Sequence, residues 1–316
     1  MKLNRLLILL AVFLLLGVAV VLLSWLKDRT RSNTFLGIDR IDNIVRVAIQ
    51  EGDKKITIEK EGQEWIITEP IRYRADREKV TSLMDKIGNL TLDGIISDKK
   101  EKHKNFDLGE GQGIEMKLEM KNGDSLSSIF GKMAADYSHI YLRLADSDEV
   151  YLATSIRKYD LKTEASQWED RSILSFNKAD LREVDLIGSD EVVNLVKEED
   201  KWLIKKGEER FDVDKGKWEN ILNSLEDLKA IEIVHEKTEE DHGFSKPEFE
   251  IRLKFDFGKM GIVVGRKKDE YKYYVKNLQD DTVFLISQGT LNRFKKSEKD
   301  IRKEIKEEKK KEEKED

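Results

Sequence analysis

One short segment of this chain occurs twice, 137 residues apart. Residues 63–68 read QEWIIT and residues 200–205 read DKWLIK. The match continues upstream, where hydrophobic residues alternate with polar ones at matching positions of the two copies: Val47, Ile49, Ile56 and Ile58 in the first, and Val184, Leu186, Val193 and Leu195 in the second. Such alternation is typical of half-buried β-strands. The chain therefore contains one folding unit in two copies, and we expect Trp65 and Trp202, in the third strand of each, to anchor the cores.

A helix is predicted after the third strand of each copy. Asp76 and Asp214 stand where a helix N-cap belongs. The residues that follow place apolar side chains at the spacing i, i+3, i+4, i+7, which forms one buried stripe: Val80, Leu83, Met84, Ile87 and Leu90 in the first copy, and Trp218, Ile221, Leu222, Leu225 and Leu228 in the second. Such a stripe favours a helix that lies on one face of a sheet.

Five further strands are expected after each helix. The clearest are residues 114–120 and 249–255, in which apolar and charged residues alternate strictly. Gly131 and Gly265 correspond in the next strand and are expected at a bend or turn. Each copy is thus predicted to be an antiparallel β-sheet with one packed helix, in the order of three strands, a helix and five strands. The fold class is α+β, as two tandem duplicated domains behind an N-terminal transmembrane helix.

The repeat sets the predicted domain boundaries. We expect α+β domains over residues 36–160 and 177–294, joined by a linker over residues 161–176. In the linker, Asp170 and Arg171 are expected to form a structural hinge, by an ion pair or by capping the second domain, and contact with a ligand is the alternative. Residues 295–316 hold ten basic and nine acidic residues. They are expected to be a solvated helix or a disordered tail, with partner binding as the alternative.

The N-terminus predicts a membrane anchor. Residues 6–26 are uncharged and apolar, and at about 1.5 Å per residue a helix of this length spans the ~30 Å core of a bilayer. A cleaved signal peptide is the alternative, but its apolar region usually has about 7 to 15 residues and is followed by a small-x-small site. We therefore expect residues 1–31 to be an uncleaved signal anchor. The short N-terminus would be cytoplasmic and the body extracytoplasmic, at the inner or cytoplasmic membrane.

Composition excludes several classes of function. The chain has 58 basic and 64 acidic residues, a net charge of −6, which argues against a nucleic-acid binder. It has no cysteine, so disulfides, thiolate metal sites and catalytic thiols are excluded. The phosphate-loop pattern GxxxxGK[ST] and the nucleophile elbow GxSxG do not occur. We expect no enzyme activity and no cofactor.

Two motifs have a functional alternative. Residues 109–113 read GEGQG, which resembles a glycine-rich phosphate loop, but they precede a strand instead of joining a strand to a helix, so a connecting loop is expected. Residues 235–242 read HEKTEEDH, in which a weak divalent-metal site is the alternative to a polar loop. The HExxH helical spacing is missing, so we expect no metal there.

The chain resembles the bacterial family catalogued as domain of unknown function 4340. The segments that carry the resemblance are EWIITEPIRYRADREKVTSLMDKIGNL, NFDLG and YLATSIRKYDLKTEASQWEDRSILSF, and Asp170, Arg171 and Leu174 match the family's junction after the first domain. The resemblance covers about residues 36–294. It implies an accessory component of gliding-motility-type ABC transporters, with membrane-protein partners, and it attributes no catalytic residue.

These observations lead to one main functional hypothesis and one alternative. The main hypothesis is a non-enzymatic, membrane-anchored accessory or scaffold subunit of an ABC-type transport assembly, with the lipid bilayer and membrane proteins as its partners. The alternative is a module that binds an envelope lipid or glycan in the groove between the two domains. A hydrolase is the weakest hypothesis, because no carboxylate pair stands out in a chain with so many acidic residues.

Overall fold

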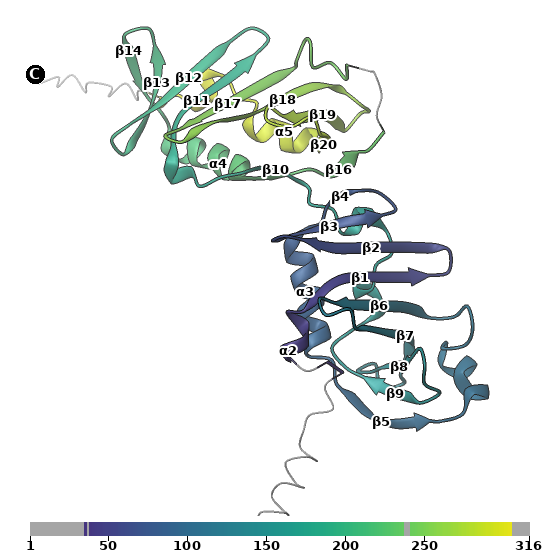
Figure 1. Ribbon diagram of the computed structural model, residues 1–316. Coiled ribbons are helices and arrows are strands. Elements are labelled where there is room, and N and C mark those ends of the chain that lie inside the picture. Colours follow the sequence, from purple (N-terminus) through teal and green to yellow (C-terminus); the bar gives the residue numbers. More distant parts are fainter. Residues whose placement is uncertain (1–34, 37, 237–240, 305–316) are drawn as a thin grey trace, which may run out of the picture. The chain divides into compact units, whose positions relative to one another are not determined.

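The computed structural model describes residues 35–36, 38–236 and 241–304 of the 316. The chain divides into two compact units, Met1–Asp170 and Arg171–Asp316. The described part of each unit is built mainly of β-strands with a few helices, around one nine-stranded sheet (Figure 1). The α+β class predicted from the sequence is therefore correct for both units.

The first unit contains nine strands and the long helix α3 (Arg77–Gly88). Its strands are β1 (Ile44–Glu51), β2 (Lys54–Glu61), β3 (Glu64–Glu69), β4 (Tyr73–Arg74), β5 (Leu92–Ser97), β6 (Ile114–Met120), β7 (Ser125–Met133), β8 (Ile140–Leu144) and β9 (Val150–Ala153). They pair in the order β4-β3-β2-β1-β6-β7-β8-β9-β5, all antiparallel. The shorter elements are α2 (Ile38–Ile41) and the 3-10 helices η1 (Lys100–Phe106), η2 (Lys158–Asp160) and η3 (Ala165–Gln167).

The second unit repeats this topology around the helix α4 (Lys215–Glu226). Its large sheet contains β11 (Leu181–Gly188), β12 (Val192–Glu198), β13 (Lys201–Lys206), β14 (Glu209–Asp212), β16 (Glu232–Val234), β17 (Phe249–Phe255), β18 (Gly258–Lys267), β19 (Lys272–Asn277) and β20 (Val283–Ser287). The order is β14-β13-β12-β11-β17-β18-β19-β20-β16. The helices α5 (Gln288–Phe294) and α6 (Glu298–Ile301) follow the last strand, and η4 (Lys178–Asp180) precedes β11.

Strand register agrees between the two units. Val47 lies opposite Ile58 in the first sheet, and Val184 lies opposite Leu195 in the second. These are the residue pairs that the repeat aligns, so the two copies share strand order and also the pairing of individual residues.

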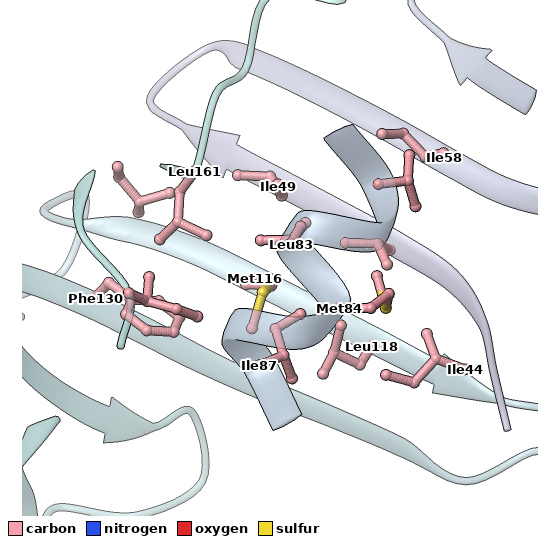
Figure 2. Close-up of a cluster of buried hydrophobic side chains, with 14 of the residues drawn as sticks. Ile44, Ile49, Ile58, Leu83, Met84, Ile87, Met116, Leu118, Phe130 and Leu161 are labelled. Carbon is pink, nitrogen blue, oxygen red and sulfur yellow. The ribbon is translucent and has the colours of Figure 1, made fainter. Parts of the chain in front are cut away.

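The core of the first unit lies between α3 and the sheet. Val80, Leu83, Met84 and Ile87 are buried along one face of the helix. Figure 2 shows Leu83, Met84 and Ile87 facing strand residues such as Met116 and Leu118. Burying a side chain of this size stabilises the fold by about 1.5–3 kcal/mol before entropy is subtracted. The stripe on α4, formed by Trp218, Ile221, Leu222 and Leu225, is buried in the same way.

Two features of the strand pattern differ from the prediction. Four strands precede each helix instead of three, because β4 and β14 add a short edge strand beside β3 and β13. In addition, β10 (Ser172–Ser175) and β15 (Asp227–Lys229) form a separate two-stranded sheet. These strands have two to four residues, too few for an alternating pattern to be visible in the sequence.

The predicted linker and tail differ from what the structure contains. Leu161 and Trp168 are buried in the first unit, and Ile173 and Leu174 are buried in the second, so residues 161–176 are not a free linker. Residues 295–304 likewise belong to the second unit, where the side chain of Ile301 is fully buried. The prediction put these segments outside the domains because they are rich in charge.

Each copy ends in the same closing segment. The backbone N–H of Asp76 donates to the carbonyl of Trp168 (2.6 Å), and that of Asp214 donates to the carbonyl of Ile301 (2.8 Å). Isolated bridges join Ala75 to Glu169 and Val213 to Arg302. The closing segments, residues 161–170 and 294–303, therefore pair with the residues that lead into α3 and α4, and they complete the repeat.

The part of the chain that the structure describes has no helix with the length and apolarity needed to cross a membrane. The predicted anchor at residues 6–26 lies outside the described residues.

Candidate functional site

The capping aspartates fix the start of each long helix. The Oδ1 atom of Asp76 accepts hydrogen bonds from the backbone N–H groups of Glu78 (3.0 Å) and Lys79 (3.2 Å). Asp214 accepts one from Lys217 (3.0 Å). These bonds satisfy N–H groups that the first helical turn leaves without a partner, so both aspartates have a structural role.

The two tryptophans of the opening motif lie at the margin of the cores. Trp65 is half-buried and packs against the core of the first unit, with the Nζ atom of Lys60 6.0 Å from its ring centre. Trp202 is also half-buried, and its ring lies edge-on to Trp218 at 5.3 Å. The tryptophans inside the cores are Trp168 and Trp218, which are 4% and 1% exposed.

Asp170 and Arg171 stand at the division between the units, and each contacts its own unit. The backbone N–H of Asp170 donates to Arg74 (3.0 Å), whose Nε atom lies 3.9 Å from the Asp170 carboxylate. The Nη1 atom of Arg171 donates to the carbonyl of Ile231 (2.9 Å). These contacts end one unit and begin the next.

The two motifs with a functional alternative lie in loops. Residues 109–113 connect η1 to β6, and an added Cβ at Gly113 would stand 2.7 Å from the carbonyl oxygens of Asp107 and Phe130, so this loop packs against β7. In the stretch 235–242, residues 237–240 lie outside the described residues. His242 is buried, and its ring stacks on Tyr274 at 4.2 Å. The described residues contain no group of three or more potential ligands that could hold a metal ion.

Both units contain a groove between the long helix and the closing segment. Groove A, in the first unit, encloses about 390 Å³ and is lined by Lys79, Leu83, Lys86, Tyr159, Asp160 and Trp168, among others. Groove B, in the second unit, encloses about 600 Å³ and is lined by Lys217, Asn220, Ile221, Arg293, Lys296 and Ile301, among others. Lys79 corresponds to Lys217 and Leu83 to Ile221, so the grooves lie on the same face of equivalent helices.

The closing segments supply the second wall of each groove, and the sequence prediction did not include them in the domains. A signal for them exists. Leu161 and Phe294, and likewise Trp168 and Ile301, are separated by 133 residues, and all four side chains are buried. The separation of the helices is 138 residues, so this change of offset concealed the match.

The charges of groove A are paired internally. The Nζ atom of Lys86 forms an ion pair with Asp160, whose side chain is 8% exposed, and lies 5.7 Å from the ring centre of Tyr159. Lys79 lies 3.6 Å from the carboxylate of Asp76. These pairs fasten the closing segment to α3 and give groove A a structural role.

A histidine joins the edge strand β5 to the turn between β7 and β8. The Nδ1 atom of His139 lies 2.5 Å from Asp136 Oδ2, and its Nε2 atom lies 3.2 Å from Asp93 Oδ2. The hydrogen bond to Asp136 is the main reason that the pKa of His139 is raised above 6.5, and the carboxylate of Asp93 adds to it. Protonated imidazole can donate to both carboxylates at once.

We expect this contact to weaken as pH rises. Because the pKa of His139 is raised in the folded chain, its contribution to stability is fully present below about pH 6.5 and is lost as pH rises through the folded pKa. The ¹H–¹³C spectrum of the histidine ring should show titration above 6.5, and Asp136→Asn should lower that midpoint. Titration of His139 at or below 6.5 in the unmodified chain would contradict the arrangement.

The strand β5 is an open edge of the first sheet. In the part of the chain that the structure describes, it pairs with β9 only. Ile95 and Ile96 are 54% and 45% exposed, whereas Ile233, on the equivalent strand β16, is 6% exposed. Edge strands in natural proteins are usually short or carry charged residues, which prevents unwanted pairing. Two adjacent exposed isoleucines are the opposite arrangement.

Comparison with known proteins identifies the family. The family model described as a domain of unknown function, DUF4340, matches residues 65–247, more than half of the chain, from β3 to the loop before β17. A search of curated proteins found no match, and neither did a search of solved structures. The resemblance stated from the sequence is confirmed over this range. The chain therefore belongs to the DUF4340 family.

Proposed function

We propose that this protein is a non-enzymatic scaffold subunit that stands outside the cytoplasmic membrane and assembles with membrane proteins of an ABC-type transport system. The anchor in this proposal is residues 6–26, which have the length and apolarity of a single span. The link to a transport system comes from the resemblance described above. The observation that carries the scaffold role is the open apolar edge at β5.

The edge β5 suits a protein partner. An extended segment of another chain could add a strand beside it, with hydrogen bonds between the backbones and apolar contacts to Ile95 and Ile96. The other three edge strands of the two described sheets are less suitable. β4 has two residues, β14 exposes Glu209 and Arg210, and β16 has three residues with its apolar Ile233 buried. The first unit therefore offers one edge for strand addition.

Purification of the full-length protein from native membranes in mild detergent, with mass spectrometry of what accompanies it, tests the proposal. We expect a permease and an ATPase to accompany the unmodified protein and to be reduced about tenfold or more by Ile95→Lys with Ile96→Lys. Val192→Lys is the matched control, because Val192 is 63% exposed on β12, an inner strand of the second sheet. This variant should retain the partners.

Two results would contradict the proposal. The first is recovery of the protein alone, and if a lipid or glycan came with it, that would favour the binding-module alternative. The second is equal recovery of partners with the double variant and with Val192→Lys, which would exclude β5 as the docking edge.

A further inference from the structure

Groove B differs from groove A in the state of its charges. Lys217 on α4, Arg293 on α5 and Lys296 just before α6 line it together. Within the described part of the chain, none of these three side chains has a hydrogen bond or an ion pair. In groove A, by contrast, Lys79 and Lys86 are each beside a carboxylate. Three cations that gather in one groove repel one another, and a bound anion relieves that repulsion.

The single carboxylate that lines groove B does not neutralise these cations. Asp300 accepts hydrogen bonds from the backbone N–H (2.9 Å) and the hydroxyl (2.7 Å) of Ser297. These bonds hold the pKa of Asp300 below its ordinary value, and the nearby charges of Lys296 and Lys217 act in the same direction. Asp300 is therefore ionised and occupied as a helix cap, and two positive charges remain in excess over the named residues.

The rest of groove B is suited to the body of a polar ligand. Its lining includes Asn220 and Asn292, whose exposed amides can donate and accept hydrogen bonds, and Gly289, which adds backbone without a side chain. The floor contains the buried side chains of Ile221 and Ile301. Binding sites of this size commonly combine an apolar floor with a few polar groups that fix orientation.

We propose that groove B binds a phosphate-bearing ligand, with Lys217, Arg293 and Lys296 on the phosphate oxygens and the body of the ligand over Ile221 and Ile301. Arginine pairs with phosphate through two parallel hydrogen bonds, and lysine acts as a point charge. The phosphate group belongs either to a soluble compound or to a lipid headgroup. This site goes beyond the scaffold role, which depends on β5 in the other unit, so either proposal can fail without the other.

Binding should be measured on the full-length protein in neutral detergent. The soluble probe is glycerol 3-phosphate, titrated by calorimetry, and the lipid probe is phosphatidylglycerol vesicles, with phosphatidylcholine vesicles for comparison. We expect binding to at least one phosphate probe, weakened by added salt because the contacts are ionic. Binding to glycerol 3-phosphate would identify a soluble source, and binding to phosphatidylglycerol alone would identify a headgroup.

A triple variant separates the site from general positive charge. Lys217→Gln with Arg293→Gln and Lys296→Gln should lower affinity about tenfold or more, because charge-assisted hydrogen bonds are lost. A matched control removes three exposed cations of the same unit outside the groove: Lys201→Gln, Lys205→Gln and Lys259→Gln. The control should change affinity less than about twofold. The midpoint of urea unfolding checks that both variants fold.

Three results would overturn the proposal. The unmodified protein fails to bind any of the phosphate probes. Alternatively, the triple variant binds as tightly as the unmodified protein, or the control loses as much affinity as the triple variant. The last result would mean that only the net charge of the unit matters.

Discussion

Gly131→Ala is expected to destabilise the first unit by about 3 kcal/mol or more. Gly131 lies within β7, beside the irregular register between Phe130 and Met133, and not at the simple bend or turn expected from the sequence. A Cβ atom placed there would stand 2.0 Å from the carbonyl oxygen of Phe106 and 3.0 Å from the side chain of Leu108. The neighbouring atom is backbone, so it cannot rotate away, and the loop before β6 would have to move.

Gly265→Ala should have the same effect on the second unit. Gly265 lies within β18, where a Cβ atom would stand 2.3 Å from the carbonyl oxygen of His242 and 3.1 Å from the ring of Phe244. The two glycines are thus equivalent, and both admit the close approach of the same loop. Here the repeat explains the residue type, because any side chain would separate the loop from the sheet.

Gly216→Ala is the control for both glycine variants. Gly216 lies in α4, and the nearest atom to an added Cβ is Asp214 Oδ1 at 3.6 Å. Alanine favours a helix over glycine, so this change should raise the free energy of unfolding by about 0.5–1 kcal/mol. Urea unfolding gives the size of each effect, and hydrogen exchange with mass spectrometry locates it. Unchanged unfolding of Gly131→Ala would refute the close contact.

The second large effect concerns the closing segments. Trp168→Ala should destabilise the first unit by about 3–5 kcal/mol, and Ile301→Ala should destabilise the second by about 2–5 kcal/mol. Trp168 is 4% exposed and its Nε1 atom donates to the carbonyl of Lys162 (2.9 Å), while Ile301 is fully buried. If residues 161–176 and 295–316 were free linker and tail, neither change would matter.

Exposed residues nearby provide the controls for this test. Tyr159→Ala and Val192→Ala remove side chains that are 64% and 63% exposed, and each should change the free energy of unfolding by less than about 0.5 kcal/mol. Hydrogen exchange should show faster exchange in α3 for Trp168→Ala and in α4 for Ile301→Ala. Loss of protection in neither helix would mean that the closing segments do not support them.

The regular parts of the fold could be predicted because their patterns are long. The alternating residues of β6 and β17 and the apolar stripes of α3 and α4 give periods that the sequence displays directly. The strands β4, β14, β10 and β15 are too short to show a period. The closing segments were missed for another reason, since their buried residues are few and stand among many charged ones.

The candidate sites were harder to predict because they depend on differences between the copies. Ile95 aligns with Ile233, yet one is exposed and the other is buried. Lys86 aligns with Ser224, so the ion pair that neutralises groove A has no counterpart in groove B. A repeat predicts what two copies share, whereas these sites arise where tertiary surroundings differ.

Site-specific photo-crosslinking in intact cells tests the scaffold proposal most directly. A photoreactive amino acid placed at Ile96 on β5 should form a crosslink to a membrane protein of the transport system, and the same group at Val192 should not. Such a crosslink requires the partner to lie beside β5 in the native envelope. Absence of any crosslink at Ile96, or the same products from both positions, would contradict the assignment of β5 as the docking edge.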